Sequence, residues 1–304
     1  YLLCEKIDHK KNLRSWVTLY ERGTLFEDKK EAILALSTEN DTLAARTIIQ
    51  ALDDRFWGIK EVAIYSLENA INLLPNLTKE RLVALAQFDE KSSVRAAAID
   101  VLATDFKGGN DFRFIFNNGL NDSSYVVVAT SLYALYETNK EEGLAAAERM
   151  EQSDNIDIIS IISKIYAGET DAKYQTFYEA AMTRTSGFDR YGVLAGYADF
   201  IKGQNALYMG KSVETFKNSA LIENAWWMRI VATNAILEMN KSINSNLNKL
   251  DKKIDNTVDE TALSNLKEDK NNHQKVANKL QEAITEIKAK ETNTRILEAI
   301  EKAK

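Results

Sequence analysis

The chain has 304 residues, 45% of them hydrophobic, so it is long enough to bury a large core. Its formal net charge of −6 argues against a nucleic-acid partner, which would require a basic face. No apolar run reaches the roughly 18 residues of a membrane span, and the single cysteine, Cys4, excludes an internal disulfide. One proline and 12 glycines favour a chain that is helical nearly throughout.

Residues 1–11 differ in character from the rest of the chain. Tyr1–Ile7 (YLLCEKI) has the apolar content of a short strand, which predicts a remnant of a preceding β domain or a linker. A lone strand would leave its backbone groups unpaired, so an unstructured end and the first turn of a helix stay open as alternatives. The chain begins with Tyr1 rather than methionine, which favours a piece of a longer protein.

Three aspartates introduce a repeated helical pattern. Asp54, Asp89 and Asp122, at spacings of 35 and 33 residues, are each followed by apolar residues at +5 and +13 and by a small residue at +9. An aspartate before a helix accepts bonds from free backbone N–H groups, so we predict these three as helix caps. The positions +5, +9 and +13 share one helical stripe. Because one unit cannot bury its own stripe, the recurrence predicts a stack of repeats.

Partner helices are expected between the marked helices, over residues 41–52, 79–87 and 111–120. Weaker copies of the pattern begin at Gly23 and Glu223, and less regular helices fill residues 139–240. The predicted fold is therefore all-α: a HEAT-like α-solenoid, a right-handed stack of helix pairs, over residues 12–240.

Residues 241–304 contain no aromatic residue, glycine or proline. Their apolar stripes predict two or three amphipathic helices that close the end of the same domain, with polar turns at 251–258 and 269–273; a helical hairpin is one arrangement that this pattern allows. A self-associating coiled coil is the alternative, but the heptads are short for it.

Large rings occur at matching places of the repeats. We predict that they pack between helix pairs, and the alternative is a peptide-binding role on the concave face. The residues are Phe56, Trp57, Tyr125, Trp226 and Trp227.

Catalytic motifs are missing from this chain. Its two histidines, His9 and His273, are far apart, and neither belongs to an H-E-x-x-H zinc motif. No phosphate-binding G-x-x-x-x-G-K-[ST] and no G-x-S-x-G occurs. The sequence therefore predicts no catalytic residue, no metal ligand and no cofactor for the chain itself.

Several segments resemble one enzyme family. The opening YLLCEKIDHKKNLRSWVTLYERGTLFEDKKEAILAL resembles the junction between the β-sandwich and the C-terminal helical domain of bacterial aminopeptidase N-like zinc metallopeptidases. ALDDRFWGIKEVAI, SSVRAAAIDVL and LNDSSYVVVATSLYAL resemble successive HEAT-like repeats of that domain, and IKAKETNTRILEAI resembles its closing helices. The resemblance is good over residues 1–138, faint over 139–220 and moderate from 221 onward.

The resemblance implies that catalysis lies upstream, in a domain that holds zinc through H-E-x-x-H and a further glutamate. This chain would be the non-catalytic bowl over that active site, controlling the access of peptides. Its partners would be the upstream catalytic and β-sandwich domains and the peptide substrates. The bacterial compartment, cytoplasmic or periplasmic, stays open.

Two other classes compete with this interpretation. One is a free-standing HEAT-like scaffold that binds another protein. The other is an enzyme on a HEAT-like fold, such as an alkylpurine-DNA glycosylase, which the net charge of −8 over residues 1–240 disfavours.

Overall fold

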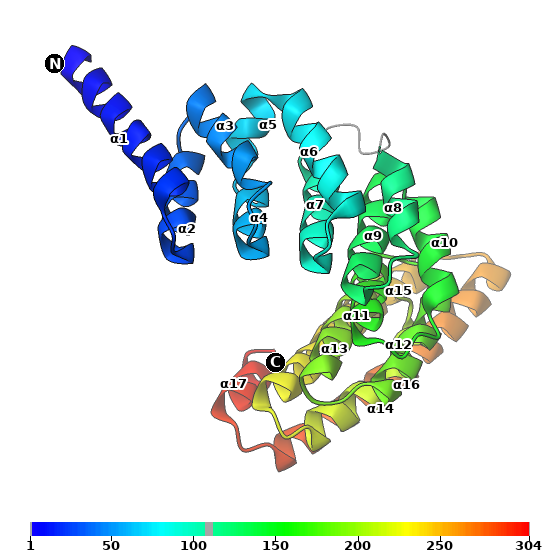
Figure 1. The fold of residues 1–304 in the computed structure, drawn as a ribbon. Helices are drawn as coiled ribbons and strands as arrows, with labels where there is room; N and C mark the ends of the chain where they lie inside the picture. The colour runs from blue at the N-terminus through cyan, green and yellow to red at the C-terminus, as the bar shows by residue number, and fades with distance from the viewer. Residues whose placement is uncertain (1, 107–111, 304) are drawn as a thin grey trace. The chain divides into compact units, whose positions relative to one another are not determined.

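The structure is a computed structural model that describes residues 2–106 and 112–303. Over these residues the fold is all-α, with no strand among the elements (Figure 1). The chain forms two compact units, Tyr1–Met150 and Glu151–Lys304. The change in composition near residue 240 falls inside one continuous helix, Trp226–Asp255, so it does not coincide with the border between the units.

Unit 1 consists of ten labelled helices, and most consecutive ones pack against each other. Four of them, α2, α4, α7 and α9, lie side by side and contact one another in that order; we call them row helices (Figure 1). The helices of the unit are α1 Leu2–Arg22, α2 Phe26–Ser37, α3 Thr42–Ala51, α4 Trp57–Ile64, α5 Glu68–Leu73, α6 Pro75–Phe88, α7 Ser92–Thr104, α8 Arg113–Gly119, α9 Tyr125–Thr138 and α10 Lys140–Met150.

The apolar stripes of the row helices form the core of unit 1. The residues at +5, +9 and +13 from each marked aspartate are at most 1% exposed. The small side chain at +9 of the third unit, Ser131, lies where α8 and α9 approach. A Cβ on Gly119 of α8 would come within 2.0 Å of Ser131 Oγ of α9, which shows how closely these two helices approach. The set comprises Ile59, Ala63, Leu67, Val94, Ala98, Leu102, Val127, Ser131 and Leu135.

The predicted strand at the N-terminus is wrong for residues 2–7, which form the first turns of α1. A helix pairs its backbone groups within its own segment, whereas a lone strand here would have no partner strand to bond with. The helix is anchored further along, because Leu13 and Tyr20, seven residues apart on one face, are buried where α1 meets α2.

Unit 2 has a second row of helices, α11, α13, α15 and α17, which also contact one another in order. The helices α12, α14 and α16 pack beside this row. The elements are α11 Ile156–Ala167, the 3₁₀ turn η2 Ala172–Tyr174, α12 Gln175–Arg184, α13 Gly187–Lys202, α14 Ala206–Ile222, α15 Trp226–Asp255, α16 Glu260–Lys290 and α17 Thr294–Lys302.

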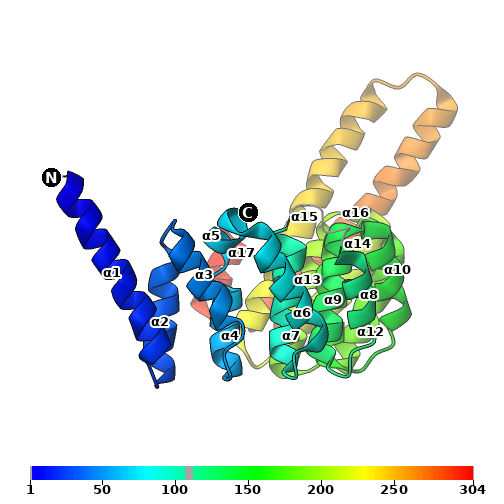
Figure 2. The same ribbon diagram turned by 45° about the horizontal axis from the view of Figure 1, so that its top comes forward.

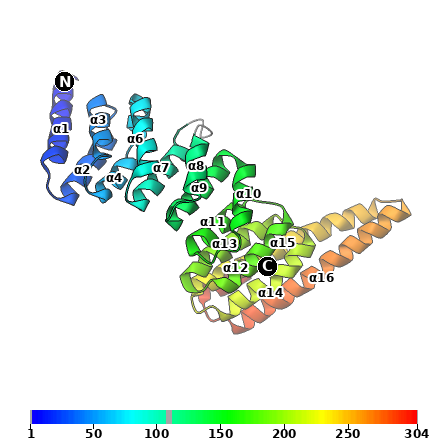
Figure 3. The same ribbon diagram turned by 45° about the vertical axis from the view of Figure 1, so that its right-hand side comes forward.

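The tail contains a long helical hairpin. The second half of α15 and the first half of α16 run antiparallel and extend away from the other helices of unit 2 (Figures 2 and 3). Its turn lies at residues 256–259, near the first predicted turn, whereas the second predicted turn, at 269–273, lies inside α16. The prediction of this second turn was wrong because polar residues also occur on the exposed face of a helix, and this part of α16 belongs to an exposed two-helix arm.

Candidate functional site

The three marked aspartates lie two residues before the N-cap of each row helix, rather than at the N-cap itself. Their Oδ1 atoms accept the backbone N–H of the N-cap residue, at 2.9 Å for Phe56, 2.9 Å for Lys91 and 2.8 Å for Ser124. Side-chain N-caps of the ordinary kind occur elsewhere, as in Asp41 at the start of α3 and Asn155 at the start of α11. Asp54, Asp89 and Asp122 thus shape the turn that leads into the helix.

The second carboxylate oxygen of each aspartate binds a basic side chain of the preceding row helix. That basic residue stands six positions after the marked residue of its own unit: Gly23, Asp54 or Asp89. The three carboxylates are largely buried, with 8%, 5% and 16% of the side chain exposed. The pairs, which we call the ion-pair ladder, are Lys29–Asp54 at 2.6 Å, Lys60–Asp89 at 2.6 Å and Arg95–Asp122 at 2.7 Å.

Unit 2 repeats the arrangement with glutamates. Arg190 of α13 pairs with Glu223 at 2.8 Å, and Arg229 of α15 pairs with Glu291 at 2.8 Å. Glu291 also accepts the backbone N–H of Asn293, the N-cap of α17, so it matches the aspartates of unit 1. Glu291 did not stand out in the sequence, because the long hairpin separates it from Arg229 by 62 residues and so breaks the period.

The basic partners lower the pKa of three of these carboxylates, Asp54, Asp122 and Glu291. The hydrogen bonds from Arg95 lower the pKa of Asp122 below its ordinary value, and those from Arg229 do the same for Glu291. For Asp54, burial raises the pKa, but the hydrogen bonds from Lys29 and from the N–H of Phe56 outweigh it, so the pKa is lowered. These groups are therefore committed to structure and are not available as general acids.

The predicted packing aromatics lie at the N-terminal ends of row helices, near the surface. Phe56, Trp57 and Tyr125 are 43%, 42% and 55% exposed, and Trp226 is 37% exposed. These rings touch neighbouring helices at their edges instead of filling the core. Phe56 meets Phe26 at 5.5 Å between centroids, Lys91 Nζ lies 4.7 Å from the Trp57 ring, Arg295 lies 4.8 Å from the Trp226 ring, and Trp227 meets Tyr191 at 5.1 Å.

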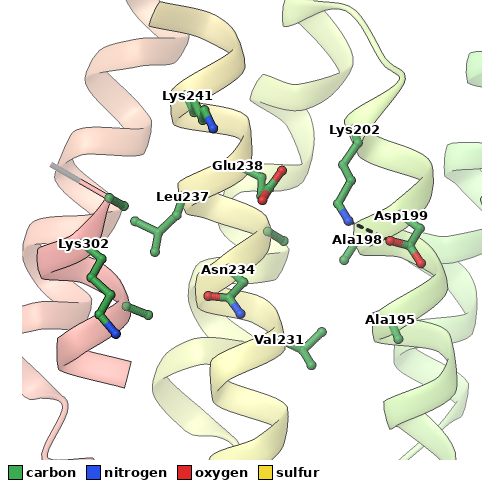
Figure 4. A pocket seen from close by; sticks show the side chains of 13 residues that line it. Ala195, Ala198, Asp199, Lys202, Val231, Asn234, Leu237, Glu238, Lys241 and Lys302 are labelled. Carbon is green, nitrogen blue, oxygen red and sulfur yellow. Dashed lines mark hydrogen bonds and ion pairs between the residues drawn. The ribbon is translucent and has the colours of Figure 1, made fainter. Parts of the chain in front are cut away.

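A groove in unit 2 runs across its row helices. The α13–α17 groove has a volume of about 680 Å³ and is bounded by α13, α15 and α17 (Figure 4). Its floor is made of small side chains, among them Ala195, Ala198 and Ala235, and charged side chains stand on its rims. The rim residues are Asp199, Lys202, Glu238, Lys241 and Lys302.

The rims of this groove offer both signs of charge. Lys202 Nζ donates to Asp199 Oδ1 at 2.8 Å, a bond that raises the pKa of Lys202 (Figure 4). Glu238 and Lys241 lie one turn apart on α15, and Lys302 approaches from α17 (Figure 4). A floor of alanines lets a backbone come close, and rim charges can meet the side chains or the terminus of a bound chain. The groove is thus suited to hold a peptide segment.

The residues that line this groove include no serine, threonine, cysteine or histidine. Over the part of the chain that the structure describes, no group of three or more histidine, cysteine, aspartate and glutamate side chains is placed to hold a metal ion. Within that same part, none of the helices has the length and apolar character needed to cross a membrane. No model of a known protein family matches the chain, and no curated protein matches it.

Proposed function

We propose that this chain is the non-catalytic C-terminal helical domain of a bacterial zinc-dependent aminopeptidase, and that it controls which peptides reach the active site of the parent enzyme. In this proposal the chain is a HEAT-like α-solenoid. The zinc belongs to an upstream catalytic domain of the same polypeptide.

The alternation of row and partner helices supports a repeat architecture. In each unit the row helices contact one another in sequence, and an ion pair links the start of one row helix to the preceding one. The segment of Phe56, Trp57 and Gly58, one of the two more specific parts of the family resemblance, forms the start of α4 next to this ladder.

The α13–α17 groove is the observation that supports the proposed control of peptide access. Its alanine floor and its mixed rim charges fit the distal part of a peptide whose N-terminal residue is processed elsewhere. Backbone contact over small side chains discriminates little between sequences, which suits a domain that admits many peptides.

A free-standing scaffold is the second candidate. A strand left over from a β domain would have favoured a domain cut from an enzyme, and residues 2–7 are helical, so this segment does not supply that support. The same groove would then hold a segment of a partner protein.

The reading frame upstream of residue 1 tests the first candidate. The proposal expects an H-E-x-x-H motif followed by a further glutamate ligand, and a zinc-dependent release of N-terminal residues by the complete protein. A reading frame without these motifs would contradict the aminopeptidase proposal and favour the free-standing scaffold.

The groove itself is tested in that complete enzyme with Asn234→Trp, which places a large ring among the lining residues. We expect KM to rise by about tenfold for a long peptide and to stay unchanged for an aminoacyl anilide, which is too short to reach the groove. The matched control is Asn272→Trp, at an exposed position of α16 outside the groove. Equal effects of Asn234→Trp on both substrates would contradict the assignment.

A further inference from the structure

The starts of the four row helices of unit 1 lie next to one another along one edge (Figure 1). The ion-pair ladder holds them there, because each of its pairs joins the first turn of one row helix to the loop before the next. Large apolar side chains stay exposed at or beside these starts. We call them the apolar edge; they are Leu25, Phe26, Phe56, Trp57, Phe88 and Tyr125.

The apolar edge follows the repeat of the turns. In three of the four turns the third residue after the marked position is aromatic, namely Phe26, Trp57 or Tyr125. In the remaining turn, between α6 and α7, the exposed ring is Phe88 at the end of α6. Ring centroids lie 5.5 Å apart for Phe26 and Phe56, and 5.4 Å apart for Phe56 and Trp57. The exposed side chains therefore form a line across the row helices.

The apolar edge is large for a surface that faces only water. Its six side chains are between 37% and 78% exposed. Since a large side chain of this kind has about 150–250 Å² of surface, the edge exposes roughly 600 Å² of it. The largest apolar patch on a typical monomer covers about 300–600 Å². A specific interface buries about 800 Å² on each partner, which the edge and the charged residues around it can supply.

Two charges of opposite sign occupy equivalent positions on this edge. Arg55 and Glu90 each follow a marked aspartate directly, Arg55 before α4 and Glu90 before α7, and both are exposed. Neither has an ion-pair partner among the residues that the structure describes. The equivalent residues of the two outer turns, Thr24 and Ser123, are uncharged. In the order of the row helices, this position is therefore neutral, positive, negative and neutral.

This charge pattern makes the edge complementary to a second copy of itself. In a dimer with a twofold axis the same surface contacts itself, so the second turn of one copy meets the third turn of the other. Arg55 then faces Glu90 of the other copy, and the twofold axis makes this contact twice. Lys91 faces the Trp57 ring of the other copy, a pairing that one chain already makes at 4.7 Å. Two copies in the same order without the rotation would place Arg55 against Arg55.

We propose that the apolar edge of unit 1 is a homodimer interface, in which a second copy of this chain packs about a twofold axis and Arg55 of each copy pairs with Glu90 of the other. The apolar side chains provide the buried area, and the two ion pairs fix the register. A different protein would not require a charge pattern that reverses its sign about the middle of the edge. The dimer does not depend on the proposed function, because it concerns the 304-residue chain alone.

The oligomeric state of this chain in solution is the first test. Sedimentation equilibrium measures its mass over a range of concentrations. We expect the mass to rise with concentration from that of the 34.3 kDa monomer to twice this value. A chain that stays monomeric up to about 100 μM would overturn the proposal and leave the apolar edge to a membrane surface or to a different protein.

Charge reversal then identifies the contact. Arg55→Glu sets carboxylates against each other at both ion pairs of the dimer, and Glu90→Arg does the same with guanidinium groups. Each substitution should raise the dissociation constant of the dimer by about tenfold or more. The two substitutions together restore opposite charges, so the dissociation constant should return to within about threefold of the parent value. A combined variant that dimerises no better than the single variants would overturn the pairing.

The apolar part of the interface is tested by a matched pair of serine substitutions. Phe88→Ser removes an exposed ring of the edge and should raise the dissociation constant by about tenfold. Phe188→Ser is the control, because Phe188 is 77% exposed against 78% for Phe88 but lies at the start of α13 in unit 2. Both variants should keep the helical circular dichroism of the parent chain. Equal dissociation constants for the two variants would overturn the proposal.

Discussion

The guanidinium of Arg95 holds the carboxylate of Asp122 through two hydrogen bonds, of 2.8 Å from Nε and 2.7 Å from Nη2. Its remaining nitrogen, Nη1, donates to the backbone carbonyl of Asp89 at 2.8 Å. One side chain therefore joins the turn before its own helix to the turn before the next row helix. Arg229 repeats this arrangement with the carbonyl of Glu223 and the carboxylate of Glu291.

We expect Arg95→Met to lower the free energy of unfolding by about 2–3 kcal/mol, because it leaves a largely buried carboxylate without its charged partner. The matched control is Arg81→Met. Arg81 pairs with Asp53, but these side chains are 48% and 53% exposed, so the loss should stay below about 1 kcal/mol. Urea unfolding followed by circular dichroism measures both changes, and similar losses would show that burial of the ladder contributes little.

Acid should unfold the chain partly through the same groups. Arg95 and Arg229 lower the folded-state pKa values of Asp122 and Glu291, so the unfolded chain binds protons more readily at these carboxylates. The two ionised carboxylates contribute fully to the free energy of unfolding above their unfolded-state pKa of about 4. This contribution is lost as the pH falls through their lower folded-state pKa values. Asp122→Asn with Glu291→Gln should lower stability at neutral pH and flatten the decline below pH ~4. The same pH dependence of stability in the double variant and in the parent chain would contradict this prediction.

A helix crossing in unit 1 depends on a glycine. A Cβ on Gly143 of α10 would lie 2.2 Å from the Cα of Tyr136 in α9, so Gly143→Ala must push the two backbones apart. We expect a loss of about 2–3 kcal/mol. Gly192 of α13 has no atom within 4 Å of such a Cβ, and Gly192→Ala should stabilise the chain by about 0.5–1 kcal/mol through helix propensity. Urea unfolding of the two variants should give shifts of opposite sign.

The tip of the α15–α16 hairpin should tolerate insertion. Val258 is 95% exposed in the turn, and lengthening a turn with a flexible segment costs only about 0.6 kcal/mol per doubling. A glycine–serine insertion after Thr257 should therefore leave stability nearly unchanged. Leu280→Ala, at a fully buried site of α16, should cost about 2–5 kcal/mol. A large loss from the insertion would mean that the tip contributes to the fold.

Local patterns in the sequence predicted the helices well. The expected partner at 41–52 is α3, and the expected partner at 79–87 lies within α6, because helical periodicity and capping are short-range properties. The strand at residues 2–7 and the turn at 269–273 were wrong for the same reason: composition over a few residues cannot distinguish a strand or a turn from part of a long helix.

Most contacts of the candidate site could not be predicted from local sequence patterns. Asp54, Asp89 and Asp122 were found by their period, but their second oxygens bind Lys29, Lys60 and Arg95 at separations of 25 to 29 residues. Phe56 and Trp57 were expected to pack between helix pairs; both contact a neighbouring row helix, but their side chains stay 43% and 42% exposed, which the sequence did not indicate.

The sequence by itself determined that the chain is helical and where its repeated units begin, since spacing along one helix decides which side chains share a face. Only the tertiary structure decided which carboxylate meets which cation, and which helix faces stay open as grooves. Glu291 pairs with Arg229 across 62 residues, and Glu61, Asp100 and Thr130 line one groove from three helices. Contacts of this kind depend on how whole helices pack, and no short stretch of sequence contains that information.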